Sequence, residues 1–138
     1  IYQDHIKPVS GLIRFLERAE IASISIALAT SSPPVNVDFV LKKTGTKKYF
    51  SVVLDASDIK HGKPNPEIYL KTAKELGVSP EKCIVFEDSQ KGIESAINAG
   101  MKVIALSTTH DEYEIEGAAL VIPDFEGITP EQVYNFVR

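Results

Sequence analysis

The chain has 138 residues, of which 43% are hydrophobic and 25% are charged, and its formal net charge is −4. This length and composition are typical of a single globular domain. A net negative surface does not attract nucleic acid or anionic membranes, so both are excluded as general partners. No apolar run approaches the roughly 18 residues that a membrane span needs, and the first residues do not resemble a secretion signal. We therefore expect a cytoplasmic location.

Apolar runs of strand length alternate with segments of helical period along the whole chain. This alternation predicts an α/β fold, a doubly wound parallel sheet with helices on both faces. No internal repeat or linker divides it. In chain order, we expect a helix over 9–20, a strand over 22–29, a helix that starts at Ser32 or one position off and runs to about Gly45, a strand over 49–55, a helix over 66–76 ended by Gly77, a strand over 82–86, a helix capped by Ser89 and ended near Gly100, strands over 102–106 and 119–122, and a last helix opened by Thr129.

Side chains that can bind phosphate or a metal ion follow three of the expected strands. They are Thr30, Ser31 and Ser32 after the first strand, Lys63 in the loop after the second, and Glu87 and Asp88 after the third. Because the carboxyl ends of parallel strands share one edge of a sheet, we expect these groups to converge. Phosphoryl transfer needs this mixture, with donors and a cation for the phosphate oxygens and carboxylates to hold Mg²⁺.

Each group also has a structural alternative. The hydroxyls can cap the next helix, the lysine can be a solvated loop residue, and the two acids can be first-turn residues that the helix dipole favours. Two observations favour the functional interpretation. Gly62, Pro64 and Pro66 restrict the backbone around the lysine, and two adjacent carboxylates are costly to desolvate unless a cation neutralises them.

The segments ALATSS, GKPNPEIY and IVFEDSQKGIESAINAG, in this order and at these separations, resemble the haloacid dehalogenase (HAD) superfamily. The nearest branch is the one that contains β-phosphoglucomutase and phosphoglycolate-type phosphatases. The resemblance covers about Pro8 to Arg138 and implies a partial HAD-like catalytic core over 8–138. It also implies Mg²⁺-dependent phosphoryl transfer, as a phosphatase or a phosphomutase, on a small phosphorylated metabolite.

The resemblance implies a role for each candidate residue. Thr30 would hydrogen-bond the transferring phosphoryl group, with the backbone amide of Ser31 beside it. Lys63 would neutralise both the phosphate and the nucleophilic carboxylate. Asp88 resembles the Mg²⁺ ligand of the family, and Glu87 resembles the adjacent acid that assists coordination directly or through water.

One part of the family's pattern is absent from these residues. The first motif of the family is an Asp-x-Asp pair that supplies the nucleophile, and no Asp-x-Asp occurs in this sequence. The resemblance implies that residues 1–7 are the return segment from a helical cap. We therefore expect a C-terminal fragment that lacks the first motif and the cap and is inactive alone, because positioning groups cannot replace the attacking carboxylate.

The expected loss of the first strand has a consequence for partners. A sheet edge exposed beside the strand 22–29 favours pairing with the missing N-terminal portion or with a second copy of the chain. The alternative to an enzyme is a catalytically inactive HAD-like module with an interaction or regulatory role. A receiver-like domain is disfavoured, because here the order along the chain is hydroxyl, lysine and then acids.

Overall fold

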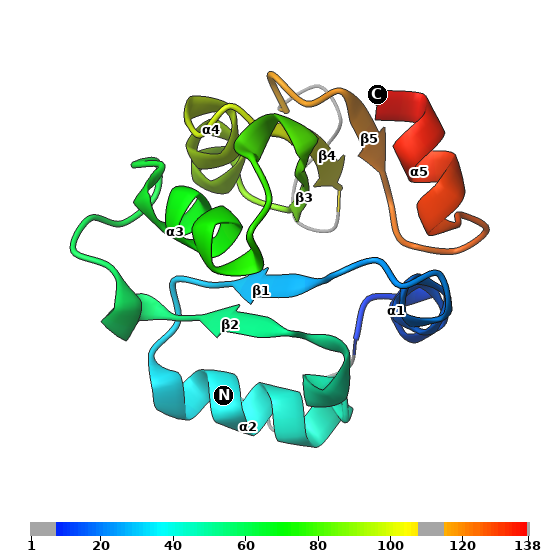
Figure 1. The fold of residues 1–138 in the computed structure, drawn as a ribbon, viewed down its shortest axis with the longest axis horizontal. Coiled ribbons are helices and arrows are strands. Elements are labelled where there is room, and N and C mark those ends of the chain that lie inside the picture. Colours follow the sequence, from blue (N-terminus) through cyan, green and yellow to red (C-terminus); the bar gives the residue numbers. More distant parts are fainter. Residues whose placement is uncertain (1–7, 108–114, 138) are drawn as a thin grey trace.

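The computed structural model describes residues 8–107 and 115–137. They form an α/β fold in which helices alternate with short strands (Figure 1). Residues 1–7, expected to be a return segment from a cap, lie outside the described residues. The elements are α1 (Leu12–Ile21), β1 (Ala27–Ala29), α2 (Pro34–Thr44), η2 (Lys47–Tyr49), β2 (Val52–Leu54), η3 (Ala56–Asp58), α3 (Glu67–Leu76), η4 (Pro80–Lys82), β3 (Ile84–Glu87), α4 (Gln90–Asn98), β4 (Lys102–Leu106), β5 (Leu120–Ile122) and α5 (Pro130–Val137).

The strands form two hydrogen-bonded groups. β1 pairs with β2, β3 pairs with β4 and β4 pairs with β5, and each pair is parallel, as expected. We expected one sheet, but within the described part of the chain no ladder joins β1 to β3. Figure 1 shows the two groups as separate sets of arrows, with α3 beside β1 and β2. Among the described residues, four strands are therefore paired along one edge only: β1 and β2 in the first group, and β3 and β5 in the second.

The first expected strand is shorter than the apolar run that suggested it. We expected a strand over 22–29, but Ala22 and Ser23 finish the preceding helix instead. The amide of Ser23 donates to the carbonyl of Glu20, and Ser23 has a left-handed φ of 58°. Hydrophobicity alone could not distinguish this helix end from a strand, because a short apolar run is compatible with both.

The helix ends follow the local chemistry of their residues. Gly45 and Gly77 end α2 and α3 with φ of 68° and 73°, a left-handed conformation that glycine adopts without a Cβ clash. The hydroxyl of Ser89 accepts the amide hydrogen of Gly92 and caps α4, as expected. Ser32 is not the cap of α2. That position is Pro33, and no side chain makes a cap hydrogen bond there.

Hydrophobic packing joins the two groups of strands. Leu54 of β2 and Val85 of β3 belong to one buried cluster, which also contains Ile68 of α3 and Ile93 of α4. A second cluster contains Phe15 of α1 and residues of β4 and β5. The helices α3 and α4 are thus fixed against the strands whose carboxyl ends carry the candidate residues. No helix in the described residues is long and apolar enough to cross a membrane.

Candidate active site

The loop between β2 and α3 carries Lys63, and hydrogen bonds hold it on both sides of the lysine. Before Lys63, the backbone amides of Lys60 and His61 donate to the carboxylate of Glu67, at 3.0 and 2.8 Å. These backbone hydrogen bonds hold the pKa of Glu67 below its usual value. After Lys63, the amide of Asn65 donates to the carbonyl of Gly62 at 3.0 Å, and its side-chain oxygen accepts the amide hydrogen of Glu67 at 2.9 Å. The lysine therefore projects from a fixed loop.

Lys63 forms a buried ion pair with Glu87. Its Nζ lies 2.8 Å from Glu87 Oε2, and only 13% and 9% of the two side chains are exposed. The same Nζ lies 5.1 Å from the centre of the Tyr69 ring, within the range of a cation–π contact. The alternative that Lys63 is a solvated loop lysine is therefore wrong.

Both carboxylate oxygens of Glu87 accept hydrogen bonds from protein groups. Oε2 accepts from Lys63 and, at 2.6 Å, from the hydroxyl of Tyr69. Oε1 accepts from the amide of Asp88 at 3.1 Å and from the hydroxyl of Ser89 at 3.4 Å. A carboxylate offers about four acceptor positions. The protein thus supplies four donors to the one buried acid at the end of β3.

The surroundings shift the pKa values of this cluster in opposite directions. Burial acts to raise the pKa of Glu87, but the charge of Lys63, with the hydrogen bonds from Lys63 and Tyr69, holds it below its usual value. Burial and the negative charge of Glu87 raise the pKa of Asp88. Burial and the same charge raise the pKa of Tyr69, which stays a neutral donor. Glu87 is therefore the more readily ionised member of the acid pair, and a negative charge on Asp88 is the more costly one.

Gly92 makes room for Glu87. A Cβ at this position of α4 would lie 2.0 Å from Cδ of Glu87, a distance that no pair of non-bonded carbon atoms reaches. The first turn of α4 thus closes over the carboxylate. Gly92 and Tyr69 are two contacts of Glu87 that were not expected from the sequence, since a tyrosine in a helical apolar stripe and a glycine in a helix give no signal of an acid beside them.

Thr30 lies at the carboxyl end of β1, next to the end of β2. Its amide donates to the carbonyl of Leu54 at 3.0 Å, and its hydroxyl accepts the amide hydrogen of Ser32 at 3.1 Å. Ser31 is exposed. The hydroxyl of Thr30 therefore orders its own loop rather than capping α2. The hydrogen bonds and ion pairs found for the described residues do not include one that joins Thr30 to Lys63 or Glu87.

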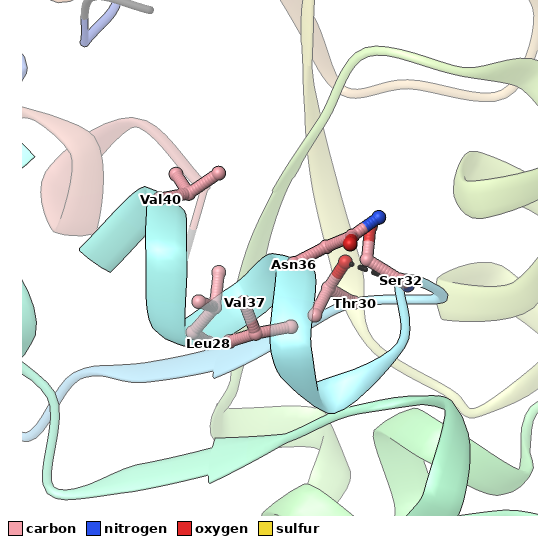
Figure 2. Close-up of a pocket in the computed structure, with 6 residues that line it drawn as sticks. All are labelled: Leu28, Thr30, Ser32, Asn36, Val37 and Val40. Carbon is pink, nitrogen blue, oxygen red and sulfur yellow. Dashed lines mark hydrogen bonds between the residues drawn. The ribbon is translucent and has the colours of Figure 1, made fainter. Parts of the chain in front are cut away.

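A cavity of about 150 Å³ lies between this loop and α2. Figure 2 shows the side chains of Thr30, Ser32 and Asn36 gathered at one end of it, while Val40 lies at the other. The cavity is lined by Leu28, Thr30, Ser32, Asn36, Val37 and Val40. Its polar end contains Thr30, whose hydroxyl is a candidate phosphate-binding group. Asn36 was not among the residues expected from sequence, because nothing in its neighbourhood marks it.

The acids fit part of a Mg²⁺ site. Mg²⁺ prefers oxygen ligands, keeps several waters and takes only one or two carboxylates from a protein. Asp88 has a pKa that burial and a neighbouring charge raise, so a nearby cation would relieve an existing cost. Among the residues that the structure describes, no group of three or more His, Cys, Asp or Glu could hold a metal ion together. Further ligands would have to come from water, from a phosphate or from other protein groups.

Comparison with known proteins identifies the family. A family model described as haloacid dehalogenase-like hydrolase matches residues 1–106. The chain belongs to the haloacid dehalogenase-like hydrolase family. A protein of Thermotoga maritima named phosphorylated carbohydrates phosphatase is 33% identical to this HAD chain. The alignment is 141 positions long and covers 100% of this chain and 63% of the relative.

Solved structures of HAD proteins have the same fold. A HAD hydrolase of family IA, variant 3, from Entamoeba histolytica matches with a TM-score of 0.85 and 35% identity, over 94% of this chain and 60% of its own. The β-phosphoglucomutase of Clostridium difficile matches with a TM-score of 0.85 and 29% identity, over 98% of this chain and 60% of its own. The resemblance drawn from the three motifs is thus confirmed, including its branch. This HAD chain spans 60–63% of the length of these three proteins.

Proposed function

We propose that the protein to which this chain belongs is a Mg²⁺-dependent HAD phosphatase or phosphomutase that acts on a small phosphorylated metabolite. The observation that carries the proposal is the buried ion pair between Lys63 and Glu87, with Nζ and Oε2 2.8 Å apart and Asp88 next in the chain. It brings the cation for phosphate and the acids for a metal ion to one place, although they are 24 residues apart in sequence.

In this proposal, three residues bind the transferring phosphoryl group. Lys63 offsets the negative charge of the phosphate oxygens. The hydroxyl of Thr30 and the backbone amide of Ser31 donate hydrogen bonds to them from the carboxyl end of β1. Fixed donors stabilise developing charge more than mobile ones, because they need not reorganise during the reaction. The hydrogen bonds that order both loops supply this rigidity.

The acids have different roles in the proposal. Asp88 is a ligand of Mg²⁺, which supplies positive charge that offsets the charge of the transferring group. Glu87 assists the coordination of Mg²⁺ directly or through a water molecule, and it holds the ammonium of Lys63 in place. The donors already bound to both Glu87 oxygens favour the indirect contribution.

The nucleophile is proposed to lie outside these 138 residues. No Asp-x-Asp occurs in the sequence, so the aspartyl-phosphate of the family would form on an aspartate from another part of the protein. A strand that carried this aspartate could pair with the open edges of β1 and β3, which have no ladder with each other among the described residues. The isolated chain is then inactive, and its partner is its own N-terminal portion, with self-association through these edges as the competing outcome.

The first substrates to test are phosphorylated carbohydrates, because the Thermotoga maritima relative carries that name. The full-length protein is assayed for phosphate release from sugar phosphates, with added Mg²⁺ and with EDTA. Asp88→Asn should raise the Mg²⁺ concentration needed for half-maximal activity and lower turnover. Glu94→Gln, an exposed acid of the same helix, is the control and should change neither. Normal activity of Asp88→Asn at limiting Mg²⁺ would contradict the metal assignment, and no turnover on any phosphate ester would favour the inactive interaction module.

A further inference from the structure

The helix α4 touches the Lys63 loop as well as the acids. It begins directly after Glu87 and Asp88, and its side chains reach across to two backbone carbonyls of the loop. The hydroxyl of Ser95 donates to the carbonyl of Asn65 at 2.7 Å, and the side-chain amide of Asn98 donates to the carbonyl of Pro64 at 3.2 Å. These carbonyls belong to the two residues that follow the lysine.

The hydrogen bond of Ser95 is not the usual one for a serine inside a helix. Such a serine commonly donates to the carbonyl four residues earlier in its own helix. Ser95 instead donates to a residue 30 positions away, and none of its surface is exposed. A buried hydroxyl whose partner moved away would lose its hydrogen bond without gaining one to water, which is costly. The bond therefore resists displacement of the loop.

The other hydrogen bonds of Asn65 extend this restraint on the loop to Lys63. Besides accepting from Ser95, Asn65 donates its amide to Gly62 and accepts the amide of Glu67 on its side chain. One residue thus ties together the turn that contains Lys63, the start of α3 and the middle of α4. Loops of this length are ordinarily the most mobile part of a domain.

We infer that Ser95, assisted by Asn98, is a positioning residue that locks the Lys63 loop onto α4, the helix that follows the acid pair. The lysine and the acids then keep a fixed separation, which the ion pair alone does not ensure once a bound phosphate competes for the ammonium. This inference rests on the proposed phosphoryl transfer for its effect on catalysis. A misplacement of a catalytic group by about 1 Å can cost about 100-fold in rate.

The test uses Ser95→Ala in the full-length protein, with Thr72→Val as the matched control. Thr72 is also buried and donates its hydroxyl to a backbone carbonyl at 2.7 Å, but its acceptor, Ile68, lies within its own helix. Both variants therefore lose one buried hydrogen bond donated by a hydroxyl, and only Ser95→Ala releases the Lys63 loop. We expect kcat to fall about 10- to 100-fold in Ser95→Ala with little change in KM, and to stay within about twofold of wild type in Thr72→Val.

Hydrogen exchange of the Asn65 amide provides a readout that does not depend on catalysis. It should be faster in Ser95→Ala, and to a smaller extent in Asn98→Ala, than in the wild type or in Thr72→Val. Asn98 is exposed, so its variant is expected to fold even if Ser95→Ala does not. Unchanged exchange at Asn65 in both α4 variants, or equal losses of kcat in Ser95→Ala and Thr72→Val, would overturn the inference. An inactive wild type would refute the proposed function instead, and the exchange comparison would still decide whether Ser95 holds the loop.

Discussion

The hydroxyl of Tyr69 donates a 2.6 Å hydrogen bond to Glu87, on the same carboxylate oxygen that binds Lys63. The tyrosine lies in α3 and the acid at the end of β3, so this bond ties the helix to the strand. It also places an uncharged donor beside an ion pair. The hydrogen bond gives the buried carboxylate of Glu87 a further donor, so it contributes to the stability of the fold and to the position of the carboxylate.

Tyr69→Phe removes this hydrogen bond and keeps the ring. Hydrogen bonds to charged groups contribute about 1.5–3 kcal/mol, so we expect the free energy of unfolding to fall by about that amount. Urea denaturation at neutral pH measures it. Tyr49→Phe is the control, because the Tyr49 ring also lies beside a lysine ammonium, that of Lys48 at 5.2 Å, and is only half-buried. Equal losses in both variants would contradict the role given to the Tyr69 hydroxyl.

The ionisation of Glu87 makes stability depend on pH. Its pKa in the folded chain lies below the usual 4.5, so its contribution is complete above that value and is lost as the pH falls through the lowered pKa. Glu67 acts in the same direction, whereas the raised pKa of Asp88 acts in the opposite one. We expect Glu87→Gln to flatten the acid side of the profile of unfolding free energy more than Glu67→Gln does. The profile is measured by denaturant titrations across the acid range.

Lys63→Ala should affect both stability and activity. Removing one partner of a buried ion pair leaves the other charge uncompensated, which typically costs about 3–5 kcal/mol. In the proposed function Lys63 is a fixed donor to the transferring phosphate, so its loss should lower the turnover of the full-length protein by about 100-fold or more. Lys74→Ala, at an exposed position of α3, should change neither quantity.

A second variant separates the two effects of Lys63. The double variant Lys63→Met, Glu87→Gln removes both charges, so much of the lost stability should return while the activity does not. Recovery of turnover in the double variant would show that the lysine acts only through the fold.

Gly92→Ala should destabilise the protein, although alanine favours helices. In an open helix position this change gains about 1 kcal/mol. Here the added carbon would lie 2.0 Å from Cδ of Glu87, so the acid or the helix must move. We expect a lower melting temperature and a weakened ion pair with Lys63. In the background Glu87→Ala, which empties that space, the same substitution should stabilise, and a cost there would indicate a different obstacle.

Most of the fold could be predicted from the sequence because its signals are local. The alternation of apolar runs and helical segments indicated the parallel α/β class, and the glycines after α2 and α3 marked both helix ends. The separation of the strands into two groups could not be predicted, because pairing depends on contacts between distant segments. The expected strand at 22–29 was too long for a related reason, since the left-handed turn at Ser23 has no signature in an apolar run.

In the candidate site, too, the sequence predicted positions along the chain but not contacts between distant residues. The sequence placed Lys63 in the loop after the second expected strand and the acid pair directly after the third, and the structure brings Lys63 and Glu87 into contact. Nothing in the sequence indicated that Glu87 would be nearly buried or that Tyr69 would be its donor. That partnership joins residues 18 positions apart on two different elements. A carboxylate within a buried strand implies that some donor exists, but not which one.

The close approach of Gly92 to Glu87 also bears on how such sequences can diverge. Because a side chain at position 92 and a glutamate at position 87 require the same space, position 92 cannot gain a side chain while the glutamate stays. We expect the two positions to covary among relatives, with a small residue at 87 wherever 92 carries a side chain. If evolution transferred the acidic residue from position 87, at the end of β3, to position 92, in α4, the intermediate sequence would need a small residue at both positions.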